Sequence, residues 1–170
     1  MVISFQKNLP AALQAINDIN DHHLFPVHEL RKVRTDDVLS VYGDAKWKIV
    51  DILNERYSSI LSEKFDLYNW LHEREQDEVA YFLNEAGSNC LSHSEFKAPS
   101  QFHLWLGPKG FVIGIQQNGK GFDARHVHEH KIKDNKGAAF DFFRRSRSSI
   151  FFDDPEEART VFMEYLFSSR

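Results

Sequence analysis

The sequence predicts an α/β fold, a two-layer sandwich in which helices cover one face of a largely antiparallel, mixed sheet. Two observations carry this prediction: apolar residues recur at helical spacing up to residue 91, and from residue 101 onward they alternate as in strands. With 170 residues, of which 42% are hydrophobic, the chain can bury a core of ordinary size. We expect one compact unit that combines a mainly helical N-terminal extension, residues 1–70, with an α/β region, residues 71–170.

Three segments of the first half have helical signals, and they span residues 8–20, 46–61 and 73–91. The first begins at Asn8-Leu9-Pro10, since proline is tolerated in the first turn of a helix. The third carries an apolar stripe made of Val79, Phe82, Leu83, Ala86 and Cys90. Residues 21–26 are expected to break the chain before Pro26, and residues 65–70 form either a strand or a helix.

Two hairpins are expected in the second half, with strands over residues 101–106 and 111–115 and over residues 149–152 and 160–167. The first hairpin turns at Gly107-Pro108-Lys109-Gly110 and the second at Asp153-Asp154-Pro155. A helix that begins at Pro155 is the alternative for the last segment. Residues 125–136 are expected to form a charged loop, and residues 138–144 a short helix.

Composition excludes several classes of function. The net charge is -4 and the pI about 6.1, so we expect no nucleic-acid partner. The single cysteine, Cys90, excludes an intramolecular disulfide and a multi-cysteine zinc site. Because no apolar run could span a bilayer and the N-terminus lacks a signal-peptide pattern, we expect no membrane partner and a cytoplasmic location.

A row of polar residues lies near the end of the third predicted helix. Glu85, Asn89 and His93 recur every four residues, a spacing that keeps three side chains on one face. An amide oxygen is a suitable ligand for magnesium, and a nearby carboxylate can deprotonate a nucleophile. The row is therefore a candidate ligand-binding face, and an ordinary solvated helix face is the alternative.

Two glycine-containing segments follow. Gln117-Asn118-Gly119-Lys120-Gly121 comes directly after a predicted strand, and its glycines allow the backbone to approach a ligand closely. A simple turn after the hairpin is the alternative interpretation. Asn135-Lys136-Gly137-Ala138-Ala139 opens the predicted short helix.

Taken in order, these three segments resemble the N-box, G1 box and G2 box of the GHKL, or Bergerat-fold, ATP-binding domains. This family includes histidine kinases, anti-sigma-factor serine kinases, gyrases and heat-shock chaperones. The resemblance covers residues 73–167 and implies a Bergerat-like fold. It implies that Asn89 ligates Mg²⁺, that Glu85 is the general base if the domain is catalytic, and that His93 lies near the phosphates.

The resemblance also assigns the two glycine segments. Gln117 stands where the family has an aspartate that reads the exocyclic amine of adenine, and a glutamine oxygen accepts that hydrogen bond without charge assistance. Gly119 and Gly121 match the glycines of the G1 box. Gly137 matches the box at whose helix start a phosphate binds, and Ala139 replaces its second glycine.

The function that the resemblance implies is a regulatory ATP-binding domain, akin to an anti-sigma-type serine kinase or switch protein. Its cofactors would be ATP and Mg²⁺, its partner another protein, and a homodimer is one expected assembly. The alternative is a degenerate adaptor that binds a protein without nucleotide, which Gln117 and Ala139 favour. Whether the chain is an enzyme stays open between these two.

Three further motifs have competing interpretations. His126, His128 and His130 would share one face of an extended chain and could bind a transition metal, whereas solvated loop histidines are the commoner case. His28-Glu29-Leu30-Arg31 resembles the phospho-accepting segment of histidine kinases. A basic cluster made of Arg144, Arg145 and Arg147 is either solvated or contacts a phosphate or an acidic partner.

Overall fold

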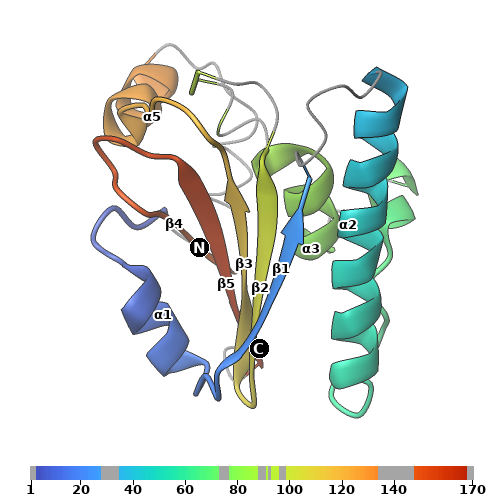
Figure 1. Cartoon of the computed structure of the whole chain (residues 1–170). Helices are drawn as coiled ribbons and strands as arrows, with labels where there is room; N and C mark the ends of the chain where they lie inside the picture. The colour runs from blue at the N-terminus through green and yellow to red at the C-terminus, as the bar shows by residue number, and fades with distance from the viewer. Residues whose placement is uncertain are drawn as a thin grey trace.

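A computed structural model describes residues 3–27, 35–72, 77–87, 91, 93–95, 99–133 and 148–167, without the side chains of residues 35–41, 70–72, 86 and 131–133. It shows a five-stranded sheet with helices packed on it (Figure 1). The predicted α/β class is confirmed. None of the described helices is both long and apolar enough to cross a membrane.

The sheet has the strand order β1-β2-β3-β5-β4, and each of these neighbouring pairs is antiparallel. The strands are β1 (Asp21–Pro26), β2 (Gln101–Gly107), β3 (Gly110–Gln116), β4 (Ser149–Phe152) and β5 (Thr160–Leu166). Both predicted hairpins are confirmed. The alternative helix from Pro155 is wrong, because residues 153–159 form a turn that leads into β5.

The prediction of a break over residues 21–26 is wrong, because these residues form strand β1. Its residues alternate between half-buried and exposed positions, and they pair with β2 over their whole length. Its sequence carries few of the β-branched residues that indicate strands, so pairing with β2 and burial of one face stabilise it instead. Pro26 is tolerated because β1 is an edge strand.

One face of the sheet packs against α2 (Thr35–Arg56) and α3 (Glu78–Tyr81). Residues 67–72 form a 3₁₀ helix, η1, and Phe82–Ala86 continue α3 as a π-helix, η2. Val79, Phe82 and Leu83 lie in the same core as Phe102, Leu104 and Ile115. Val112 lies on the opposite face, because neighbouring residues of β3 point to opposite sides of the sheet.

Helix α1 (Leu9–Ala15) covers the second face of the sheet (Figure 1). Asn8 caps its N-terminus by accepting a 3.0 Å hydrogen bond from the Ala11 N–H. The helix ends before the predicted Asn20, because Asn17 adopts a φ of 56°, which no α-helix accommodates. Ile16 at its end packs on the sheet, so the expectation of helices on one face only is wrong.

The long helix predicted over residues 73–91 is described from Asp77 to Gly87. The Asp77 carboxylate caps it by accepting from the Ala80 N–H at 3.0 Å. At Gly87, the backbone runs so close to β3 that a Cβ would overlap Cδ1 of Ile115. Glycine is required for this approach, which brings the chain after the helix to the end of β3.

The charged segment predicted as a loop forms helix α5 (Ala124–Lys133) instead. Asp123 caps it, accepting from the His126 N–H at 2.8 Å. The segment is too polar to show an apolar stripe, so hydrophobic periodicity could not reveal it. The short helix predicted over 138–144 lies outside the described residues.

Candidate functional site

Two of the three motif segments lie side by side at one end of the sheet. These are the Glu85 segment, residues 85–93, of which residues 85–87, 91 and 93 are described, and the glycine segment, residues 117–121; the contacts come from the two residues that follow the Glu85 segment. The side chain of Ser94 contacts Gln117, and Glu95 contacts Lys120. The residues that flank them also meet, since Gly87 lies against Ile115. The structure therefore brings together segments that the sequence analysis had joined only by resemblance.

Gln117 is the buried polar residue at the centre of this junction. It follows β3 directly, its backbone N–H donates to the Arg159 carbonyl at 2.8 Å, and the residue is 1% exposed. Its Oε1 contacts the Ser94 hydroxyl, while its Nε2 is buried without a hydrogen-bond partner. A buried polar group in this state costs free energy unless a ligand or water satisfies it.

The amide of Gln117 can also be oriented the other way round. The Ser94 hydroxyl lies 2.5 Å from the Leu91 carbonyl, which can only accept, so its single proton belongs there. The Ser94 oxygen is then best satisfied by an Nε2–H of Gln117, which moves Oε1 to the place where Nε2 now lacks a partner. Rotation of the amide thus exchanges a buried donor for a buried acceptor at one position.

The backbone of the glycine segment is held by neighbouring charged residues. The Gly119 carbonyl accepts from Arg159 Nε at 2.8 Å, and Gly119 has a φ of 133° that favours glycine. The Lys120 N–H donates to the Glu95 carboxylate at 2.9 Å. A Cβ on Gly121 would lie 2.5 Å from the Glu157 carbonyl oxygen. Both glycines therefore have a local structural role.

Glu85 and His93 do not share one regular α-helix. Glu85 is half-buried in the π-helix η2, and π-helical turns occur frequently at functional sites. His93 is exposed in a turn beyond the helix, with its ring centroid 5.7 Å from that of Phe122. The four-residue spacing therefore does not place them on one face by α-helical geometry.

Several predicted site residues lie outside the part of the chain that the structure describes. They are Asn89, Gly137 and Ala139 of the nucleotide motifs, His28, and the basic cluster of Arg144, Arg145 and Arg147.

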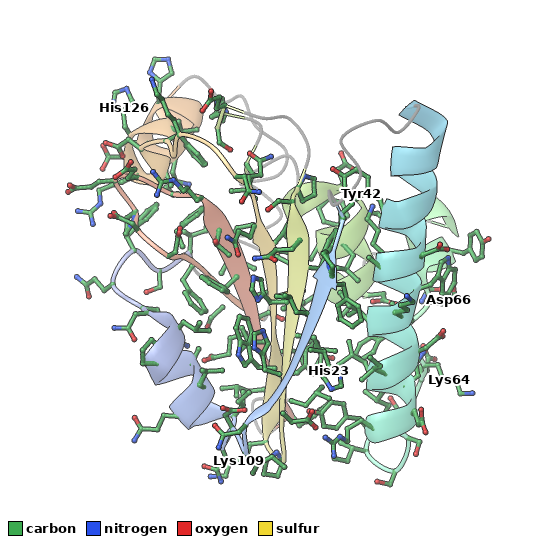
Figure 2. All side chains as sticks on the ribbon, viewed as in Figure 1. His23, Tyr42, Lys64, Asp66, Lys109 and His126 are labelled. Carbon is green, nitrogen blue, oxygen red and sulfur yellow. The ribbon has the colours of Figure 1, made fainter. Side chains whose placement is uncertain are left out.

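The extended chain that would place His126, His128 and His130 on one face is not formed, because the segment is helical. The rings of His126 and His130 stack with their centroids 6.1 Å apart. Figure 2 shows His126 on the outer side of α5. His128 instead contacts the Phe5 ring at 5.5 Å. Across the described residues, no group of three or more His, Cys, Asp or Glu is placed to hold a metal ion.

Sequence reasoning missed three contributors to the junction: Ser94, Glu95 and Arg159. They bear no motif, and only the register between distant segments brings them to Gln117 and the glycine segment. It also missed a shallow cavity of about 490 Å³, between the N-terminal segment and α5, lined by Ile3, Ser4, Phe5, Gln6, Arg125 and Glu129. The Arg125 guanidinium lies 5.6 Å from the centroid of the Phe5 ring there.

Comparison with known proteins gives no further guide to this site: no family model, no curated protein and no solved structure matches the chain.

Proposed function

We propose that the chain is a regulatory GHKL-type domain that binds ATP and Mg²⁺ where the Glu85 segment meets the glycine segment. The observation that carries the proposal is the position of Gln117. It is buried at the end of β3, it touches the chain just beyond the Glu85 segment, and its amide has an atom without a partner. A buried amide in that state suits the recognition of a nucleobase edge.

In this proposal each residue binds the part of Mg-ATP that the resemblance implies. Gln117 reads the base, Asn89 offers an amide oxygen to Mg²⁺, and Gly137 begins the helix that faces the phosphates. In a serine kinase, Glu85 would accept the proton of the incoming hydroxyl, and catalysis would consist of positioning and charge neutralisation. A protein partner, with a homodimer as one assembly, belongs to the same proposal.

A second candidate is an adaptor of the same ancestry that binds a protein without nucleotide. The observation that favours it is the satisfied backbone of the glycine segment. Glu95 already occupies the Lys120 N–H, and Arg159 occupies the Gly119 carbonyl. A ligand that approached this backbone would have to displace both side chains and break their hydrogen bonds.

Calorimetric titration with Mg-ATP separates the two candidates. Asn89→Ala should abolish the Mg²⁺-dependent part of the affinity, because it removes a metal ligand. Gln117→Asp should tighten binding about tenfold, because a charged acceptor forms the stronger hydrogen bond. Gln14→Ala, which removes an exposed amide on α1, is the matched control and should bind as the wild type does. Absence of binding at millimolar nucleotide would leave the adaptor.

A further inference from the structure

Two histidines on neighbouring strands form a planar pair at the edge of the sheet. Nε2 of His22, on β1, lies 3.0 Å from Nδ1 of His103, on β2, and the ring planes differ by 9°. With centroids 5.2 Å apart, the imidazoles meet edge to edge in nearly one plane. Both rings are parallel to the Trp105 indole, at centroid distances of 4.4 Å and 5.1 Å.

A chain of hydrogen bonds fixes the protonation of this pair. Gln116 Oε1 can only accept, and it receives Gln101 Nε2 at 2.6 Å and His103 Nε2 at 2.7 Å. His103 therefore carries its proton on Nε2, and its Nδ1 must accept from His22 Nε2–H. The observed geometry therefore requires a neutral His103, whose Nδ1 carries no proton.

A second proton on His103 is incompatible with this arrangement. A proton on His103 Nδ1 would point at the His22 Nε2–H, and two cationic rings at this distance repel. The pKa of His22 is lowered mainly by burial, and further by the charges of His103 and His23. The charge of Asp18 raises it by a smaller amount. Burial lowers the pKa of His103, and its hydrogen bond to Gln116 opposes that shift.

The pair joins the edge strand to the rest of the sheet. Of the described strands, only β2 pairs with β1, and the histidine contact crosses that boundary. A metal ion does not fit between the rings, because the two nitrogens face each other at hydrogen-bond distance. The arrangement therefore responds to protons rather than to a bridging metal.

We propose that the hydrogen bond between His22 and His103 is a pH-sensitive contact, the catch, which holds β1 on the sheet at neutral pH and breaks in mild acid. The charged groups near the pair are Asp18, after α1, and His23 on β1 itself. On the other face of β1, Asp21 pairs with His23 at 2.8 Å and with Arg56 of α2 (Figure 2 shows His23 on the α2 side). This second attachment leaves β1 tethered when the catch opens.

The direction of the response follows from linkage. Both rings bind protons less readily in the closed state than free histidine, whose pKa is 6.5. Closure is therefore favoured above that pH, and it is lost as the pH falls through 6.5 and below.

Amide hydrogen exchange of the wild-type chain, corrected for intrinsic rates, tests the catch between about pH 8 and about pH 5. The opening constant of β1 should rise in the acid part of this range, by up to about tenfold per pH unit for each proton that is coupled to opening. The amides of β3 and β5 should show no such rise. Equal pH dependence in β1 and β5 would overturn the proposal.

Two variants isolate the histidines responsible. His103→Gln should reduce the pH dependence of β1 exchange, because it removes the proton that His103 takes up on opening and leaves only the contribution of His22. The control, His23→Gln on the same strand, should keep the response. If His103→Gln does not fold, ring titration by NMR of the wild type decides: two coupled steps below the free value support the catch, and two independent steps at the free value refute it.

Discussion

Replacing Tyr57 with phenylalanine removes one hydroxyl that serves both ends of the β2–β3 turn. The Tyr57 hydroxyl lies 2.8 Å from the Gly107 carbonyl and 2.9 Å from the Gly110 carbonyl, and it accepts from the Gly107 N–H at 3.2 Å. The residue is buried at the end of α2. Phenylalanine keeps the ring contact with Phe167, at 4.6 Å, so the change isolates the polar contribution.

The expected cost is about 2 kcal/mol of unfolding free energy: roughly 1 kcal/mol for a lost hydrogen bond and a similar amount for buried backbone groups that lose their partner. For a domain of this size that corresponds to a fall in Tm of about 6 °C. The difference should also shrink at alkaline pH. Burial raises the pKa of Tyr57 to about 12, so the unfolded wild type releases the proton first and loses this stability between pH 10 and about 12.

Urea unfolding followed by circular dichroism measures the difference. The matched control is Tyr68→Phe, since Tyr68 is 57% exposed, and its cost should stay within about 0.5 kcal/mol. A loss below about 0.5 kcal/mol for Tyr57→Phe would show that the hydroxyl does not stabilise the turn.

Two further variants test the packing that positions the site. Lys7→Met should lower the unfolding free energy, measured in urea, by about 2 kcal/mol. Glu164, whose side chain is 2% exposed, would lose the Lys7 ammonium that lies 2.5 Å from its carboxylate. The partial exposure of Lys7 keeps this cost below that of a fully buried pair. Adding Glu164→Gln should recover part of the loss, and a neutral single variant would contradict the pairing. Gly87→Ala should cost about 2 kcal/mol through overlap with Ile115, and Ile115→Val should relieve some of it. An unchanged midpoint for Gly87→Ala would refute the close approach of helix and sheet.

The elements that sequence patterns predicted are those whose signal is local. Strand β2 begins with polar and apolar residues in alternation, β3 is a short apolar run, and Gly107 and Gly110 mark the turn between them, so their hairpin is visible in the sequence. Strand β1 is not, because Asp21, His22 and His23 give no apolar alternation and the strand forms only by pairing with β2.

In the candidate site, too, some features could be predicted from the sequence and others could not. The order of the motifs predicted that the Glu85 segment and the glycine segment would be neighbours, and Ser94, the residue after the Glu85 segment, does contact Gln117. The contacts of Glu95 and Arg159 with the glycine segment could not be predicted. They arise from side chains 25 and 40 positions away from their partners along the chain.

Nuclear magnetic resonance of the backbone amides during a Mg-ATP titration tests the proposed nucleotide site most directly. If ATP binds at the junction, the amides of Gly119, Lys120 and Gly121 and the side-chain amide of Gln117 should shift in a saturable way, while those of α1 remain unchanged. No shift in these four groups at millimolar Mg-ATP, with the fold intact, would contradict the proposal.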